Sequence, residues 1–304
     1  MKKSLFFAIA LPLSMILASC DGPKTTDETE TGTDAALPET GAPETTEAQE
    51  AAFPWDFPEN IKNEGLAEGQ TILSIHSFYP DALKESDDPA NETYIFYNGK
   101  LTSVGDTKST VYSFSEEVEM PNSLLIPIPE GQTAKKGDIV LTWWQSGSGM
   151  ERALVTDAKD PASPKVDYLD LNYKDDGTGF AQDHADEQIK PNSFVVLKDG
   201  EWQPGAQIVV TGDGSYEAGI LISCTKDKVL AKCFAGKINT FKKSDCKIVP
   251  LNQSLKVGDQ VRAIFTSSYK DGYTITKIDE NVGRVWVEGS FGNEILSILE
   301  VYKE

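Results

Sequence analysis

Beyond residue 53, hydrophobic side chains recur at every second position of this chain in short runs. In one run Ile139, Leu141 and Trp143 alternate with their neighbours, and comparable runs follow at 168–173 and 284–288. This period places successive side chains on opposite faces of an extended strand, whereas a helix requires a period near 3.6. Clusters of Gly, Pro and Asp separate the runs, and these residues favour turns. The pattern therefore predicts an all-β fold of short strands joined by hairpins.

Glycine opens a strand-like run at four places, which indicates internal repetition. Gly69, Gly137 and Gly205 are each 68 residues apart, and Gly258 follows 53 residues later. Short strands in units of this size favour five-stranded barrels, whose closure leaves few exposed edges. Because such barrels bury little core alone, we expect neighbouring ones to pack together. We predict three to four tandem barrels, over residues 53–130 (the weakest match), 134–198, 203–251 and 255–304.

The first twenty residues have the organisation of an export signal. Lys2 and Lys3 precede an apolar stretch, Leu5–Leu17, that is too short to span a bilayer. The stretch ends in Leu17-Ala-Ser-Cys20, which resembles the lipobox of bacterial lipoprotein precursors. The resemblance implies that signal peptide 1–19 is removed and that Cys20 carries acyl chains such as palmitate. Cys20 would then anchor the protein to a membrane of the bacterial envelope, on the extracytoplasmic side. The alternative is a secreted protein in which Cys20 is incidental.

Residues 20–52 are predicted to form a disordered tether. The segment is rich in Thr, Glu and Pro and contains almost no side chain that could be buried, so it cannot offset the entropy cost of ordering. The whole chain has 28 Lys plus Arg against 48 Asp plus Glu, a net charge of −20. A surface this acidic repels polyanions, so we expect no nucleic-acid partner.

The third unit resembles a known family. Its blocks Tyr216–Ile222, Val229–Phe234 and Cys246–Leu251 combine an aromatic residue, a glycine, two hairpin arms and a closing strand that ends in Pro-Leu. This combination is similar to Tudor or Agenet-type SH3-like barrels, and the likeness extends over residues 137–302. The resemblance implies an SH3-like (Tudor-like) barrel for each unit.

In eukaryotic Tudor domains an aromatic cage binds methylated lysine or arginine through cation–π contacts. An exported bacterial protein meets no histone tail, so a basic peptide or a cationic polymer is the ligand class that remains. Strand alternation predicts that Trp144 and Tyr168 face outward, with Asp170 nearby to favour a cation. The alternative is a structural role, in which these rings cover hydrophobic surface or fill contacts between units. The candidate binding surface comprises Trp143, Trp144, Tyr168, Asp170, Tyr173 and Trp286.

Three cysteines follow Cys20, and two outcomes are open for them. In an oxidising compartment one disulfide forms, pairing Cys246 with either Cys224 or Cys233. Equally, all three fit alternating core positions and remain free thiols. A catalytic cysteine is not expected, because no histidine follows residue 184.

Catalytic and metal-binding signatures are absent from the sequence. The chain has two histidines, His76 and His184, and no nucleophile elbow, phosphate loop, zincin motif or dinucleotide fingerprint. The segment Asp183–Glu187 gathers one histidine with three carboxylates, but metal ligands usually come from separate elements. We therefore expect no metal, no cofactor and no catalytic residue.

The prediction is a non-catalytic, membrane-anchored envelope lipoprotein that binds a peptide or protein partner, or scaffolds an envelope assembly. One alternative is an envelope glycan hydrolase that uses a pair of carboxylates. A deep pocket lined by carboxylates of shifted pKa would favour that enzyme. The other alternative is a purely structural spacer, which would have no specific partner.

Overall fold

A computed structural model of the chain describes residues 52–76, 78–174, 177–179 and 186–303. These residues belong to one compact unit, Glu50–Glu304. The predicted signal peptide, the lipid attachment site and all but the last residue of the predicted tether lie outside the described residues. The all-β prediction is confirmed, because antiparallel strands dominate and the described residues contain one α-helix.

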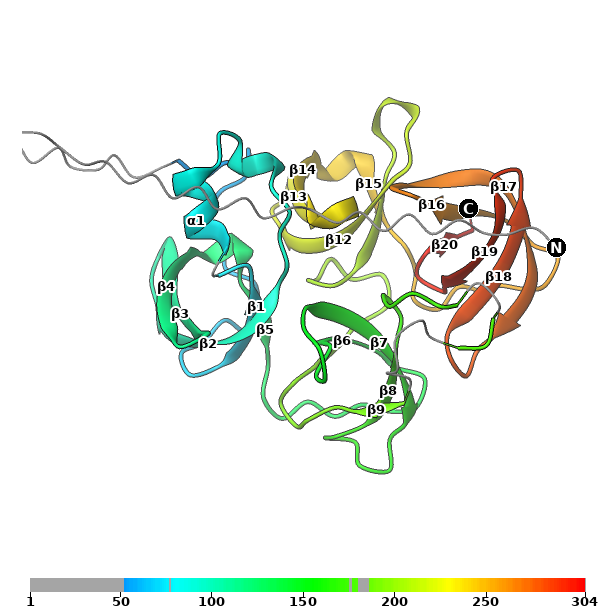
Figure 1. The fold of residues 1–304 in the computed structure, drawn as a ribbon, viewed down its shortest axis with the longest axis horizontal. Coiled ribbons are helices and arrows are strands. Elements are labelled where there is room, and N and C mark those ends of the chain that lie inside the picture. Colours follow the sequence, from blue (N-terminus) through cyan, green and yellow to red (C-terminus); the bar gives the residue numbers. More distant parts are fainter. Residues whose placement is uncertain (1–51, 77, 175–176, 180–185, 304) are drawn as a thin grey trace, which may run out of the picture. The chain divides into compact units, whose positions relative to one another are not determined.

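The described strands form four consecutive groups of five, which we name the first to fourth modules (Figure 1). In each module the first strand pairs with the second and the fifth, and the third and fourth follow the second. The first module contains β1 (Thr71–Ser74), β2 (Tyr97–Val104), β3 (Lys108–Ser113), β4 (Glu116–Pro121) and β5 (Ile126–Ile128), with α1 (Phe78–Glu85), η1 (Pro89–Asn91) and η2 (Asn122–Leu124). The second contains β6 (Ile139–Trp143), β7 (Met150–Asp157), β8 (Lys165–Tyr168), β9 (Glu187–Gln188) and β10 (Val195–Val196).

The third and fourth modules share one sheet, because Glu217 of β12 pairs with Ser268 of β17. The third contains β11 (Gln207–Val210), β12 (Glu217–Cys224), β13 (Lys228–Lys232), β14 (Ile238–Lys242) and β15 (Cys246–Ile248), with η3 (Gly212–Gly214), η4 (Phe234–Gly236) and η5 (Lys243–Asp245). The fourth contains β16 (Gln260–Phe265), β17 (Ser268–Asp279), β18 (Arg284–Gly289), β19 (Gly292–Ser297) and β20 (Val301–Tyr302).

One backbone arrangement recurs in all four modules, ahead of the first strand. A glycine with left-handed backbone donates its N–H to a carbonyl of the second strand, and the pairing of that strand with the third shifts just after the accepting residue. Such a bulge bends the strand, so the second strand can pair with both its neighbours. Glycine suits the position because it has no Cβ to oppose a positive φ. The glycines are Gly69, Gly137, Gly205 and Gly258, and the accepting residues are Leu101, Val155, Leu221 and Ile275.

The prediction of closed barrels is not met by these sheets. In no module does a described ladder join the fourth strand to the fifth, so each module keeps two edge strands. The reason is length, since β9 and β10 have two residues each and β5 and β15 have three. A 3-10 turn leads from the fourth strand to the fifth in the first and third modules.

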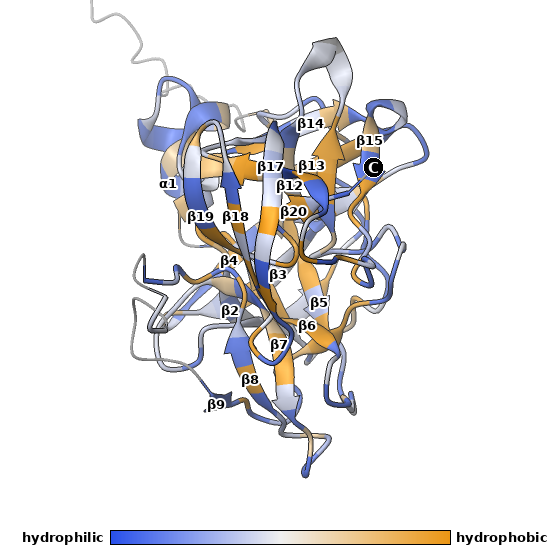
Figure 2. Ribbon diagram, turned by 90° about the vertical axis from the view of Figure 1, so that its right-hand side faces the viewer, coloured by the Kyte–Doolittle hydropathy of each residue, from blue (hydrophilic) through white to orange (hydrophobic). Residues whose placement is uncertain are grey.

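The modules are held together by shared apolar packing. Strands are largely hydrophobic and connecting loops largely hydrophilic (Figure 2). One buried cluster draws on all four modules, with members such as Phe96, Leu141, Leu230 and Leu299. The second, third and fourth modules add smaller cores of their own. The eight-residue helix α1, which the sequence pattern did not predict, packs the buried ring of Tyr79 against this shared cluster.

Candidate functional site

The structure separates the predicted aromatic residues into two groups. The prediction that Trp144 and Tyr168 face outward together is wrong for Tyr168, which is fully buried. Its strand β8 has covered side chains on both faces, so alternation cannot distinguish inside from outside there. Trp144 lies against Gly147 of its own turn, and its indole N–H donates to Ser146 Oγ at 2.9 Å. Trp143 is half-buried and packs against the shared cluster.

The second group converges where the second and fourth modules meet. The rings of Tyr173 and Trp286 meet edge to face, with centroids 6.1 Å apart. Asp170 lies three residues before Tyr173, and both line one cavity. A cation does lie over Trp286, but it belongs to the chain itself: Lys277 Nζ is 3.8 Å from the ring centroid.

A buried ion pair forms the base of this junction. Arg152 of β7 is 2% exposed and donates to Asp170 from its backbone N–H (2.8 Å), Nε (3.0 Å) and Nη2 (2.5 Å). Its Nη1 donates to Gln207 Oε1 of β11 at 2.7 Å, which ties in the third module. Burial raises the pKa of Asp170, but the guanidinium and its hydrogen bonds outweigh this and hold that pKa below its usual value. Asp170 is therefore an ionised carboxylate with both oxygens occupied.

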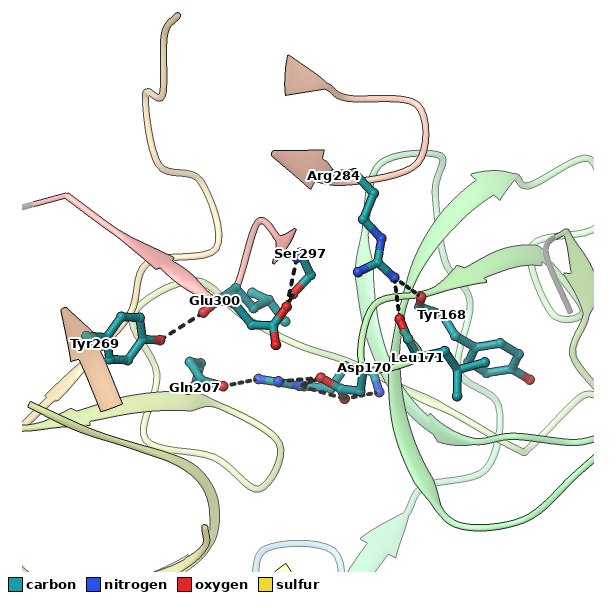
Figure 3. A network of polar contacts seen from close by, with 10 residues as sticks. Tyr168, Asp170, Leu171, Gln207, Tyr269, Arg284, Ser297 and Glu300 are labelled. Carbon is teal, nitrogen blue, oxygen red and sulfur yellow. Dashed lines mark hydrogen bonds and ion pairs between the residues drawn. The ribbon is translucent and has the colours of Figure 1, made fainter. Parts of the chain in front are cut away.

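The fourth module contributes a second arginine and a second carboxylate (Figure 3). Arg284 of β18 is 1% exposed, and its Nη2 donates to the carbonyls of Tyr168 (2.7 Å) and Leu171 (2.9 Å). Glu300 accepts from the backbone N–H and hydroxyl of Ser297 at 2.8 and 3.0 Å. Burial raises the pKa of Glu300 above its usual value.

A cavity of about 740 Å³ opens among these groups. Its described lining combines charged and amide groups with apolar side chains from the second and fourth modules. It suits a polar ligand or an inserted polar side chain. The described lining residues are Leu169, Asp170, Leu171, Asn172, Tyr173, Lys174, Arg284, Asn293, Glu294, Ile295, Leu296 and Glu300.

Glu151, the neighbour of Arg152 on β7, is a further buried carboxyl at this junction. Its Oε2 has no hydrogen-bond partner among the described residues. Burial, together with the charge of Asp170, raises its pKa to about 8, while Lys232, Arg152 and Arg284 act in the opposite direction. Glu151 therefore holds its proton more tightly than an ordinary glutamate.

An exposed aromatic cluster on the first module was not predicted from the sequence. Phe78 of α1, Tyr97 of β2 and Phe114 of the β3–β4 turn lie together, with Phe78–Tyr97 and Tyr97–Phe114 centroid distances of 5.8 and 5.3 Å. Phe78 is 45% exposed and Phe114 63%. The ring of His76 lies 5.2 Å from that of Phe114 and is fully buried. We name these four residues the aromatic face.

Phe114 has an unusual backbone for its residue type. Phe114 and Ser115 have φ of 48° and 71° and form the two-residue loop between the paired residues Ser113 and Glu116. Such loops favour Asn and Gly, and a bulky residue with positive φ is an outlier. This side chain therefore covers His76 at a cost in backbone strain, a cost that often marks functional surfaces. The aromatic residue at a tight turn was the one available sequence signal.

A small acidic pocket adjoins the aromatic face and shares Phe78 with it. The pocket has a volume of about 280 Å³, and its lining includes the carboxylates of Asp81, Glu85 and Glu92. No lysine or arginine is among its described lining residues. The surface beside Phe78 is therefore suited to a cation.

The fourth module presents a smaller exposed aromatic pair at the corresponding turns. Phe265 at the β16–β17 turn and Phe291 at the β18–β19 turn have ring centroids 5.3 Å apart. They are 37% and 48% exposed. Phe291 also stacks on the buried ring of Tyr273 at 6.3 Å.

The cysteines of the third module are free thiols in the structure. Cys246 is buried, and Cys224 and Cys233 are half-buried. The predicted disulfide between Cys246 and either other cysteine does not occur here. Burial raises the pKa of Cys233 to about 12 and that of Cys246 to about 11, which keeps both protonated. They serve as apolar core residues.

The described residues contain neither a metal-binding cluster nor a membrane-spanning helix. No group of three or more His, Cys, Asp or Glu side chains is placed there to hold a metal ion. Most of the Asp183–Glu187 cluster lies outside the described residues. No described helix is long and apolar enough to cross a bilayer.

No protein-family profile matches the chain, and no curated protein matches it.

Proposed function

We propose that this protein is a non-catalytic lipoprotein of the bacterial envelope that binds a protein partner through the aromatic face of its first module. The observation that carries the proposal is the aromatic group of exposed Phe78, half-buried Tyr97 and exposed Phe114, held in place partly by a strained turn. Exposed aromatic side chains provide large contact area at a low cost in conformational entropy, which makes them typical anchors of protein interfaces.

The proposal includes an SH3-like (Tudor-like) character for the four modules. The strand order, with the first strand between the second and fifth, supports this, as does the bulge in every second strand. The shared buried cluster and the Arg152–Asp170 pair would make the modules a stiff frame for the binding face.

The proposal places the chain on a membrane through Cys20. The lipobox-like segment that ends at Cys20 supports lipid attachment, since two or three acyl chains anchor a protein stably. The acidic segment that follows would act as a tether that holds the modules away from the headgroups. An acidic surface also favours a partner with basic segments.

The test is crosslinking and pull-down of the full chain from native envelopes. We expect a specific partner to be captured by the wild type and lost from the double variant Phe78→Ala/Phe114→Asn. The matched control is Phe265→Ala/Phe291→Ala in the fourth module, which should retain capture. The variant Cys20→Ala should leave the membrane fraction. Capture that survives loss of the aromatic face would overturn the assigned site, and absence of any partner would leave the structural spacer.

One observation favours a second candidate, the glycan hydrolase. The 740 Å³ cavity contains an ionised carboxylate, Asp170, and a carboxyl with raised pKa, Glu300, which are the two states a glycosidase needs. We rank this candidate second because Arg152 occupies both oxygens of Asp170. An activity assay against peptidoglycan and oligosaccharides tests it. Product release by the wild type that is lost in Glu300→Gln would establish the enzyme.

A further inference from the structure

His76 has an unsatisfied acceptor beneath the aromatic face. Its Nε2 is buried and has no hydrogen-bond partner among the described residues. A buried polar atom without a partner typically costs about 1–3 kcal/mol. A group supplied by a binding partner is one way in which such an atom is satisfied.

The tautomer of His76 follows from its other nitrogen. Nδ1 lies 3.2 Å from Ser74 Oγ. We assign the hydrogen to Nδ1, so that the Ser74 hydroxyl oxygen accepts it. Burial holds the pKa of His76 below its usual value. His76 is therefore neutral, and its Nε2 presents a lone pair.

Phe114 is the exposed side chain that packs on the His76 ring. Phe114 contacts the His76 ring from an exposed turn and is itself 63% exposed. Rotation of an exposed side chain about χ1 occurs in picoseconds to nanoseconds. An inserted group can therefore take the place of the Phe114 ring and reach His76.

The chemistry around His76 selects the inserted group. A lone pair requires a hydrogen-bond donor, the faces of Tyr97 and Phe78 attract a cation, and Asp81 and Glu85 lie in the pocket that adjoins Phe78. A protonated lysine side chain meets all three requirements. A neutral donor would meet only the first.

We infer that the aromatic face binds a lysine side chain of the partner, whose ammonium donates a hydrogen bond to His76 Nε2 while it lies against the rings of Tyr97 and Phe78. The inference rests on the proposed function and names the group that its binding site recognises. The hydrogen bond makes the site selective for a cation that retains an N–H. A quaternary ammonium would satisfy the rings but leave Nε2 without a partner.

The experiment measures binding of the full chain to three synthetic peptides by calorimetry. The peptides differ only in their single central lysine, which is unmodified, dimethylated or trimethylated. The dimethylated form adds bulk but retains one N–H. We expect the trimethylated peptide to bind about tenfold more weakly than the other two, because it loses a hydrogen bond to a charged donor.

The variant His76→Phe keeps an aromatic ring but removes the acceptor. It should bind all three peptides within about twofold of one another, and Phe291→Ala should retain the wild-type preference. Thermal unfolding of each variant verifies its fold, and His76→Gln, which keeps an acceptor, should restore part of the preference if His76→Phe unfolds. Equal binding of the trimethylated peptide by the wild type, or no binding of any peptide, would overturn the inference. Neither result would affect the pull-down test of the partner itself.

Discussion

At the scale of single residues, the aromatic face contains two features that each lower the stability of the folded protein. Phe114 has a positive φ that suits Asn or Gly, and the buried Nε2 of His76 has no hydrogen-bond partner among the described residues. Each feature costs on the order of 1–3 kcal/mol. Residues that lower stability side by side on an exposed surface are typical of binding sites rather than of structural surface.

Two replacements of Phe114 test whether its backbone is strained. Phe114→Asn relieves the backbone strain and loses the ring contacts with His76 and Tyr97, so its free energy of unfolding should lie within about 1 kcal/mol of the wild type. Phe114→Ala loses the same contacts and keeps an unfavourable φ, so it should be less stable than Phe114→Asn by about 1 kcal/mol. Urea denaturation of the two variants measures the difference. Equal stability of the Asn and Ala variants would contradict the assigned strain.

At the scale of elements, one device shapes every module. Two hydrogen bonds link the start of the first strand to the bulge in the second. In the first module the N–H of Gly69 donates to the carbonyl of Leu101, and the N–H of Leu101 donates to the carbonyl of Gln70. The bend that results lets five short strands enclose an apolar interior without full closure.

The ion pair between β7 and the segment after β8 should be strongly coupled. Arg152→Met leaves Asp170 buried without its cation, and Asp170→Leu leaves the guanidinium without its anion, so each should lower the free energy of unfolding by about 3–5 kcal/mol. The double variant should lose much less than the sum, because no unpaired charge remains. Chemical denaturation of the three variants provides the cycle. Additive losses would show that the two side chains do not depend on each other.

At the scale of the whole molecule, the modules meet around buried charge. Arg152, Asp170, Arg284 and Glu300 come from the second and fourth modules, and Gln207 from the third. Charges removed from water need close partners, so this junction tolerates little relative movement of the modules. A stiff junction is consistent with modules that form one rigid support for the proposed binding face, and not with modules that move independently.

Stability should fall as the pH rises from about 5 to 8. Glu151 has a pKa of about 8 in the folded protein and an ordinary value of 4.5 when unfolded, so the folded state holds the proton more tightly. The contribution is complete below pH 4.5 and is lost as the pH rises to 8, at up to about 1.4 kcal/mol per pH unit. The raised pKa of Glu300 likewise makes the free energy of unfolding fall as the pH rises. The lowered pKa of His76 makes it rise with pH up to about 6.5. Denaturation of Glu151→Gln should show a flatter pH profile than the wild type, and parallel profiles would refute the assignment.

The sequence alone predicted the all-β class and the glycine ahead of the first strand of each module. The two-residue period and the four glycines are local features, because strand alternation and a positive φ depend on a few adjacent residues. Asp170, Tyr173 and Trp286 lie at one junction in the structure, but the cations beside them are Arg152 and Lys277 of the chain itself, so their role as a binding surface stays a prediction. The outward position of Tyr168 was wrong, because β8 is covered on both faces by packing that alternation does not record.

Tertiary structure alone decided where the proposed binding face and the buried charges lie. His76, Phe78, Tyr97 and Phe114 are separated in sequence by a helix and two strands, and nothing in their spacing brings them together. The same holds for Arg152, Arg284 and Glu300, which meet because whole modules pack. Local periodicity specifies which face of a strand is apolar, but the partner of that face is chosen by packing between segments distant in the chain.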